Sequence, residues 1–386
     1  MLNGIIYGYQ GKKMNAYIGS TTFGILIASL AMAGPAFAGG DFEPERKRSG
    51  IGISGELSVE LQSDNTFDSE DPDAELSDTY TTTEAGIDVT FGDHLLAHGG
   101  FVLEPIRDPG PGEDRFFEDL GLYAEELYGQ VNLGRGFSIL GGKFNPAFGT
   151  AWDATPGLYG TDFAEDYETT ERIGFAAAFE REAGGLGTVT LAGSVYQADT
   201  TGLSRSLFND RGRTSVSDGG VSNTESLESY TITFDAAEAP ALAGANLHLG
   251  YRFQKQGEAV DDLEDEQGYV VGLNSSRSVN GVEFGWLGEI AYLDNAEGTL
   301  DEVWYFTIGG SVKFGGKYNI ATSYTARPRD VSGGPDFDDR LIQVSAGVEL
   351  GRDWTFDAGY KYHVESDVEN HTVGVLFAKA ISFGQQ

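Results

Sequence analysis

The chain has 386 residues, with 60 Asp and Glu against 25 Lys and Arg, a formal net charge of −35 and no cysteine. The absence of cysteine excludes disulfide scaffolds, thiol catalysis and zinc sites built from cysteine. The acidic balance disfavours nucleic acids and anionic lipid headgroups as partners, because both would repel the chain. A mean hydropathy of −0.25 argues against a helical membrane protein. A β-rich membrane protein remains open, since aromatic residues and glycine are abundant.

The N-terminal part has the features of a secretory signal peptide. Two lysines precede an apolar run at 18–32, and Ala36-Phe37-Ala38 supplies the small residues typical of a cleavage site. A transmembrane anchor is the alternative, but the apolar run is short and broken by glycine. We therefore expect residues 1–38 to be removed on export and residues 39–50 to form a short periplasmic segment.

From residue 51 onward, apolar and polar residues alternate with a period of two. In the segment 354–364, for example, Trp354, Phe356 and Tyr360 share one parity, and polar residues share the other. This alternation indicates strands with one apolar and one polar face. Most such segments are long enough for a tilted strand to cross a bilayer. The segments lie near 51–61, 79–91, 94–104, 119–133, 137–147, 170–181, 186–197, 226–236, 243–255, 267–275, 281–293, 302–314, 317–327, 340–350, 354–364 and 371–383.

The connections between these segments alternate between short and long. Short ones such as 92–93 and 134–136 carry the Gly and Asp that tight hairpins need. Long ones include 62–78, 148–169 and 198–225. A soluble sandwich or propeller does not require this asymmetry, whereas an outer-membrane barrel does. We predict an all-β fold, a transmembrane antiparallel up-and-down β-barrel of about 16 strands formed by residues 51–386.

One segment carries a more specific signal. Residues 141–149 read GGKFNPAFG, which resembles the Gly-Arg/Lys-Phe-x-Pro-x-Phe-Gly stretch of phosphate-selective and related porin-like families. Together with the strand plan, the signal peptide and the closing aromatic strand, the chain resembles Gram-negative outer-membrane porins. The resemblance implies a passive channel in the cell outer membrane, a homotrimer, and contact with outer-membrane lipid and lipopolysaccharide. One departure is that Gly384-Gln385-Gln386 follow Phe383, where porin chains normally end on the aromatic residue.

The same resemblance assigns a role to the third outer loop, 148–169, by position alone. In trimeric general porins this loop folds into the barrel and narrows the pore. Here it combines carboxylates with aromatic residues, and an ordinary solvated loop is the alternative reading. The candidate constriction residues are Trp152, Asp153, Tyr159, Asp162, Glu165, Asp166 and Glu168.

Strand parity also predicts which charged residues line the lumen. The set is Arg172, Arg252, Lys313, Lys361, Glu283 and Glu289. The lumen array of Arg and Lys found in phosphate-selective families is not visible in this sequence. An excess of lumen carboxylate concentrates cations and repels anions, so we expect a cation-preferring pore for small hydrophilic solutes.

Two other function classes remain open. Aromatic residues such as Trp152 and Tyr159 on a constriction loop suit a substrate-specific channel for a sugar, an organic acid or a siderophore. The second of these classes is an adhesin or structural barrel with a blocked lumen. We do not expect an enzyme, because the sequence lacks catalytic triad spacing, the H-E-x-x-H pattern and a Walker loop.

The outer loops raise the question of bound metal. Oxygen-rich loops suit Ca²⁺ or Mg²⁺, although no segment fits the EF-hand pattern. The alternative is a solvated acidic surface that binds no metal ion. No other cofactor is expected. The candidate Ca²⁺ ligands are Asp261, Asp262, Glu264 and Asp265.

Overall fold

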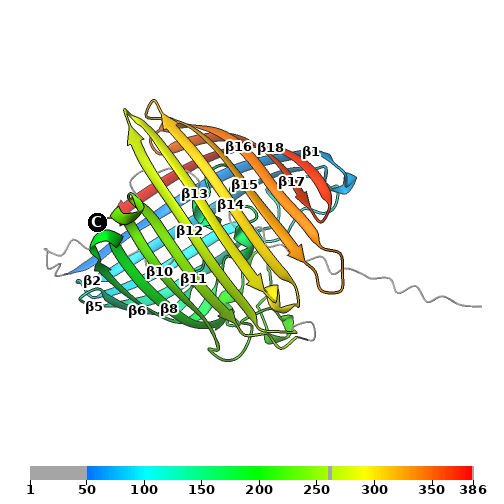
Figure 1. The fold of residues 1–386 in the computed structure, drawn as a ribbon. Helices are drawn as coiled ribbons and strands as arrows, with labels where there is room; N and C mark the ends of the chain where they lie inside the picture. Colours follow the sequence, from blue (N-terminus) through cyan, green and yellow to red (C-terminus); the bar gives the residue numbers. More distant parts are fainter. Residues whose placement is uncertain (1–49, 260–262, 385–386) are drawn as a thin grey trace, which may run out of the picture.

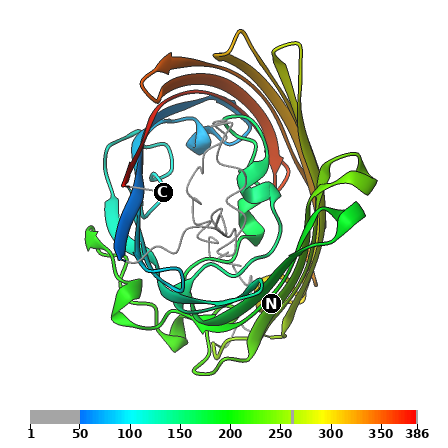
Figure 2. The ribbon, with the colours of Figure 1, turned by 90° about the vertical axis from the view of Figure 1, so that its left-hand side faces the viewer.

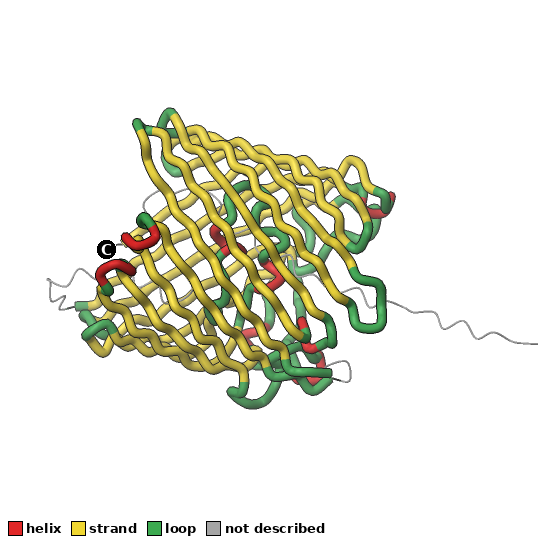
Figure 3. Tube along the Cα trace, in the orientation of Figure 1, coloured by secondary structure: helices red, strands yellow, loops and turns green. Residues whose placement is uncertain are grey.

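The computed structural model describes residues 50–259 and 263–384. The predicted signal peptide, 1–38, therefore lies outside the described residues, as does most of 39–50. Strands make up most of the described chain, and the helices are short turns between them (Figures 1 and 3). An 18-stranded sheet includes two strands of two residues each, β4 (Arg115–Phe116) and β9 (Leu207–Phe208), which leaves 16 long strands.

These 16 long strands form a closed antiparallel barrel. Each strand pairs with its neighbour, and β1 (Ile51–Ser69) pairs with β18 (Val368–Gly384) to close the ring. The prediction of an all-β barrel of about 16 strands is confirmed. The other long strands are β2 (Ser77–Phe91), β3 (Leu95–Pro105), β5 (Leu120–Gly134), β6 (Phe137–Phe144), β7 (Arg172–Glu182), β8 (Thr188–Ala198), β10 (Ser229–Ala239), β11 (Ala245–Gln254), β12 (Glu266–Val279), β13 (Val282–Asp294), β14 (Glu302–Phe314), β15 (Tyr318–Asp330), β16 (Phe337–Gly351) and β17 (Trp354–Glu365).

The helical elements are all one turn long. No helix of the described residues is long and apolar enough to cross a bilayer. The elements are α1 (Ala151–Ala154), η1 (Pro72–Ala74), η2 (Glu165–Tyr167), η3 (Gly184–Leu186), η4 (Gly202–Ser204), η5 (Val216–Asp218), η6 (Pro240–Leu242) and η7 (Ala296–Gly298).

Turn lengths differ between the two ends of the barrel, as predicted. Turns such as 135–136 and 280–281 close one end, and the connections 145–171 and 199–228 lie at the other. The structure corrects the predicted bounds of the first outer loop, 62–78. Strands β1 and β2 stay paired out to Asn65 and Ser77, and β1 itself continues to Ser69. Backbone pairing does not need an apolar face, so the strands continue past the point where alternation in the sequence stops.

The two faces of the barrel wall differ in polarity. Along β14, Trp304, Phe306 and Ile308 are exposed on the outside, whereas Tyr305 and Thr307 are buried on the inside. An aromatic row also runs along the loop ends of neighbouring strands, with ring centroids 4.4 to 6.4 Å apart. Such rows typically lie at the level of the lipid headgroups. The row contains Tyr230, Tyr251, Phe253, Tyr269, Tyr292, Trp304 and Phe306.

This polarity makes a direct prediction about stability in lipid. Ile308 lies in the middle of β14 with its side chain 62% exposed on the outer face. Replacing it with lysine should lower the free energy of unfolding by about 2–4 kcal/mol, because an ammonium group would lie near the bilayer midplane. Denaturant titration of the protein refolded in lipid vesicles measures this, with Ile308→Leu as the control. Equal stability of the two variants would contradict a lipid-facing position.

Candidate pore and its inner loop

The loop between β6 and β7, residues 145–171, lies inside the barrel against its wall (Figure 2). We call it the inner loop. Gly149 starts its turn away from the β6 strand with φ +76°, and its N–H donates to Nε2 of His248 at 3.1 Å. Gly157 has φ +109°, and a Cβ there would lie 1.9 Å from Nε2 of Gln343. Glycine is therefore required where the loop turns and where it meets the wall.

One carboxylate of the wall fastens both ends of the inner loop. Glu289 of β13, only 3% exposed, accepts hydrogen bonds from N and Oγ1 of Thr150 at 2.8 Å each. It also accepts from N of Ala151 at 3.0 Å and from the hydroxyl of Tyr167 at 2.6 Å. Hydrogen bonds to a charged acceptor each contribute about 1.5–3 kcal/mol. Glu289 is thus the central polar anchor of the loop.

The basic residues of the wall hold the middle of the loop. Nζ of Lys361 lies 2.7 Å from Oδ2 of Asp162. The guanidinium of Arg327 pairs with Asp166 and also with Asp339 of β16. These wall cations point inward, but their charges are neutralised by the loop and the neighbouring strands.

The remaining predicted wall residues also have partners. Arg252 donates to the carbonyl oxygen of Tyr167 at 2.6 Å and pairs with Glu266 at 2.9 Å. Nη1 of Arg172 donates to the carbonyl oxygen of Thr170, and Lys313 pairs with Glu349 at 2.5 Å. Glu283 accepts a hydrogen bond from Ser276 near the turn end of the barrel. All six predicted wall residues therefore lie on the inner face, but little basic charge is left unpaired there.

Apolar contacts add to the attachment of the loop. Phe148 and Tyr167 pack with residues of β12, β13 and β14, including Leu287 and Tyr305, and Trp152 lies against this cluster. Further along, Leu158 and Tyr159 pack on β18. Burying one such large side chain contributes about 1.5–3 kcal/mol. The barrel thus has a core of its own, formed between the loop and one side of the wall.

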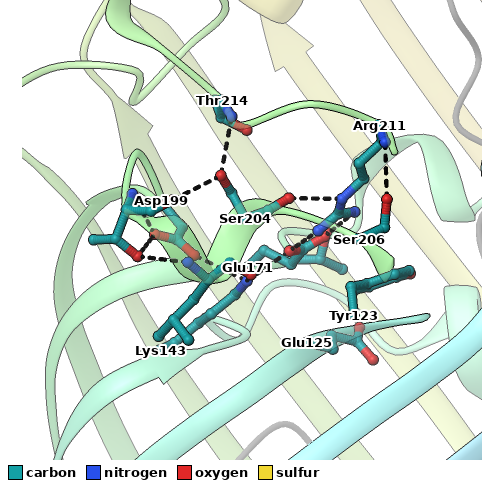
Figure 4. A network of polar contacts seen from close by, with 12 residues as sticks. Tyr123, Glu125, Lys143, Glu171, Asp199, Ser204, Ser206, Arg211 and Thr214 are labelled. Carbon is teal, nitrogen blue, oxygen red and sulfur yellow. Dashed lines mark hydrogen bonds and ion pairs between the residues drawn. The ribbon is translucent and has the colours of Figure 1, made fainter. Parts of the chain in front are cut away.

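The segment 141–149 takes part in a second polar network (Figure 4). Nζ of Lys143 lies 2.7 Å from Glu171 and 2.9 Å from Asp199. Arg211, from the loop 199–228, donates to Glu171 at 2.8 Å and lies 3.9 Å above the ring of Tyr123. This network holds the loop 199–228 to the end of the inner loop, so Lys143 has a structural role. The resemblance of the segment to phosphate-selective families stays a prediction.

Apart from Trp152, which packs against the apolar cluster, the predicted constriction residues separate into two groups. Asp162 and Asp166 face the wall and are paired, and Tyr159 is buried with its hydroxyl donating to Asp64 at 2.6 Å. The hydroxyl of Thr161 donates to Glu165, and burial followed by the charge of Asp162 raises the pKa of Glu165 well above its usual range. These four residues belong to the attachment of the loop.

Asp153 and Glu168 form the second group, and Glu168 lies close enough to carboxylates of β2, β3 and β5 to interact with them electrostatically. Burial, followed by the nearby carboxylates of Glu125, Asp153 and Glu84, raises the pKa of Glu168 well above its usual range. Burial also raises the pKa of Asp153 to about 6. We use the term acidic aperture for the set Glu84, Glu104, Glu125, Asp153 and Glu168.

Three members of the acidic aperture were missed in the sequence. Glu84 and Glu104 lie at inward-facing positions of β2 and β3, so the alternation in the sequence was sufficient to identify them. Glu125 was not, because β5 has a bulge there. Gly100 pairs with Glu126 and Phe101 pairs with Ala124, which leaves Glu125 unpaired. Glu125 reaches Asn145 at 3.0 Å and Glu126 reaches His98 at 3.4 Å, so two consecutive carboxylates face the lumen.

The predicted calcium ligands are only partly described. Asp261 and Asp262 lie outside the described residues. Asp265 pairs with Lys255 at 3.0 Å and accepts a hydrogen bond from N of Gln256. Within 50–259 and 263–384, no three His, Asp or Glu residues are arranged to hold a metal ion. A metal site that includes Glu264 stays a prediction.

Comparison with known proteins identifies the fold and no closer relative. No protein-family model and no curated protein matches the chain. The outer-membrane channel DcaP of Acinetobacter baumannii superposes with a TM-score of 0.55 at 12% identity, covering 86% of this chain and 97% of that one. Salmonella typhi OmpF in complex with daunomycin gives 0.53 at 11% identity, with 86% and 97% covered. Pseudomonas aeruginosa OpdK with vanillate gives 0.50 at 10% identity, with 86% and 99% covered. The chain therefore has the fold of outer-membrane porins.

The anchoring role of Glu289 can be tested by removing its carboxylate. Glu289→Ala leaves the buried donors of Thr150, Ala151 and Tyr167 without an acceptor, which should cost about 3 kcal/mol of stability or more. The loop should detach from the wall, so single-channel current should become larger and noisier. Glu283→Ala on the same strand is the matched control, since Glu283 makes no contact with the loop. Unchanged current noise in Glu289→Ala would contradict the anchor.

Proposed function

We propose that the protein is a porin of the outer membrane of a Gram-negative bacterium. It forms a water-filled channel for the passive diffusion of small hydrophilic solutes, assembles as a homotrimer and prefers cations. The observation that carries the cation preference is the acidic aperture, where Asp153 and Glu168 of the inner loop lie opposite the carboxylates of β2, β3 and β5. A charged constriction of one sign raises the local concentration of the opposite ion.

The distribution of paired charge supports this proposal. Lys361, Arg327 and Arg252 each pair with an acidic residue on the inner loop or on a neighbouring strand. Lys143 and Arg211 are paired in the network around Glu171. The basic residues of the wall are therefore neutralised, and the carboxyl groups of the acidic aperture are in excess over the bases near them.

A substrate-specific channel is the second candidate. A neighbour in fold, OpdK, has been solved with vanillate, which makes an aromatic carboxylate a reasonable probe. In this chain Tyr159 is buried and Trp152 donates its indole N–H to the carbonyl oxygen of Gly149 at 3.1 Å. The Tyr159 ring is covered, the Trp152 ring packs against the apolar cluster of the inner loop, and a carboxylate solute would be repelled by the acidic aperture. The observations favour the general channel, and the expectation that the protein is no enzyme stays a prediction.

Ion selectivity tests the proposal directly. In a planar bilayer under a tenfold KCl gradient, the reversal potential should show cation preference. The triple variant Glu84→Gln, Glu104→Gln, Glu125→Gln should lower the cation to anion permeability ratio by about threefold or more, because it removes three carboxyl groups from the aperture. The matched control, Glu180→Gln, Glu182→Gln, Glu238→Gln, removes three exposed charges at the opposite end of the barrel. Anion preference in the unmodified protein would overturn the proposal.

The selectivity should also depend on pH in a particular window. With a pKa of about 6, Asp153 is ionised at pH 7.5 and protonated at pH 5. The contribution of Asp153 to the cation preference should therefore be present at pH 7.5 and be lost as the pH falls through 6, well above the range in which ordinary carboxylates titrate. Asp153→Asn should have a lower ratio at pH 7.5 and a smaller decline over the same window. A ratio that is constant from pH 7.5 to 5 would contradict this assignment.

A further inference from the structure

A histidine of the wall lies at the point where the inner loop leaves β6. His248 of β11 is 3% exposed and contacts the neck of the loop, which we define as residues 148–152. Its Nε2 lies 3.1 Å from N of Gly149, and its Nδ1 lies 2.7 Å from Oδ1 of Asp235 on β10. The proposed channel function does not use this histidine.

The two contacts determine which nitrogen of His248 carries the hydrogen. The N–H of Gly149 can only donate, so Nε2 accepts and carries no hydrogen. Nδ1 therefore holds the hydrogen and donates it to the carboxylate of Asp235. The arrangement requires the neutral imidazole, because a second hydrogen at Nε2 would collide with the N–H of Gly149.

A second acceptor lies beside Nε2. Gly272 of β12 pairs directly with His248, and a Cβ at Gly272 would lie 2.5 Å from Oε2 of Glu289. The carboxylate of Glu289 therefore lies over Gly272, next to the imidazole. A Cβ at Gly149 would lie 3.0 Å from Oε1 of Glu289, so this carboxylate and His248 contact the same glycine.

The surroundings of His248 allow a proton to reach it. The side chain of Asp235 is 37% exposed, so water in the lumen can deliver a proton to the pair. Histidine is the side chain that ordinarily changes its charge between about pH 5 and 8. Strand β12 presents only a glycine at this position. The charged groups around His248 are Asp235 on β10, Glu289 on β13, Asp153 next to the neck, and Arg252 on β11, which is paired with Glu266 at 2.9 Å.

We propose that His248 is a pH-sensitive anchor for the neck of the inner loop. In its neutral form it accepts a hydrogen bond from Gly149 and holds the neck to the wall. When Nε2 takes up a proton it becomes a donor, so the N–H of Gly149 loses its acceptor and the imidazolium turns to Glu289. Glu289 then divides its oxygens between the imidazolium and the N–H groups of Thr150 and Ala151, which weakens a second contact of the neck.

The geometry confines the change to the neck. The ion pair between Lys361 and Asp162 lies further along the loop and does not involve His248. Gly149 has φ +76°, and glycine moves between positive and negative φ at little cost. Acid should therefore loosen the neck while the middle of the loop stays attached.

Trp152 reports on the neck, because its indole N–H donates to the carbonyl oxygen of Gly149 at 3.1 Å. In the purified full-length protein, acrylamide quenching of tryptophan fluorescence should increase as the pH falls from about 8 to 5, and Trp152→Phe should remove the increase. The loosened neck should become about tenfold more populated, since protonation removes one hydrogen bond. In a planar bilayer, the current noise of the open channel should increase over the same range.

His248→Gln separates the contact from the charge. Its amide oxygen can accept from Gly149 but does not titrate, so this variant should keep low quenching and low noise throughout the range. His94→Gln is the matched control and should keep the response, since His94 is exposed and contacts the carbonyl oxygen of Asn132 at the turn end of the barrel. Asp153→Asn should also keep the response, which distinguishes it from the titration assigned to ion selectivity.

A response that persists in His248→Gln would overturn the proposal, and so would constant quenching across the range in the unmodified protein. If His248→Gln does not fold, Asp235→Asn keeps the histidine and removes the charge behind it. The midpoint of the response should then move to lower pH, and an unchanged midpoint would also overturn the proposal. The fluorescence measurement needs no open pore, so it gives an answer even if the proposed channel function is wrong.

Discussion

The constraint on which the rest of the structure depends is that a bilayer offers no hydrogen-bond partner to the backbone. A sheet can cross it only when every strand has two neighbours, and pairing of β1 with β18 provides this closure. Closure in turn assigns alternate side chains to lipid and to lumen, which is why a chain with a net charge of −35 can span a membrane. The charges lie on the inner face and in the loops, and the outer face carries residues such as Ile308 and Trp304.

The side chains of the wall cannot fill the lumen by themselves. The inner loop occupies part of it and supplies hydrogen-bond and ion-pair partners for the polar residues of the wall. Glu289 accepts backbone and side-chain hydrogen bonds from both ends of the loop, and Lys361 and Arg327 pair with loop carboxylates. The apolar cluster around Phe148 and Tyr167 then excludes water from one side of the barrel. The space left open lies on the other side, where Arg211 of the loop 199–228 and Lys143 pair with Glu171, and the wall acids Glu84, Glu104 and Glu125 outnumber these bases.

The alternation of apolar and polar residues along the strands predicts most of the residues that face the lumen. It does not predict them where the backbone departs from a regular period of two. The 16 strands and the inward positions of Arg252, Lys361 and Glu289 follow from a period of two, because pleating is a local property of the chain. The partners of these residues cannot be predicted from that period. Glu289 and Thr150, for example, are distant in sequence, and no local pattern encodes the path of the loop that brings them together. A bulge in β5 shifts the parity by one residue, so that Glu125 and Glu126 both reach the lumen and a single period over the whole strand assigns only one of them.

The cation preference that we propose follows from which charges the fold neutralises. Attachment of the inner loop uses basic wall residues such as Arg327 and Lys361 together with loop acids such as Asp166 and Asp162, so each contact removes one positive and one negative charge from the lumen. Because the chain has far more acids than bases, this pairing exhausts the bases first. In the channel that we propose, the carboxylates that remain, Glu84, Glu104 and Glu125 on the wall with Asp153 and Glu168 on the loop, set the potential that a solute meets. The proposed selectivity is thus a consequence of how the inner loop is held, and on this proposal a change to an anchoring ion pair alters the field in the pore even where no pore-lining residue is touched.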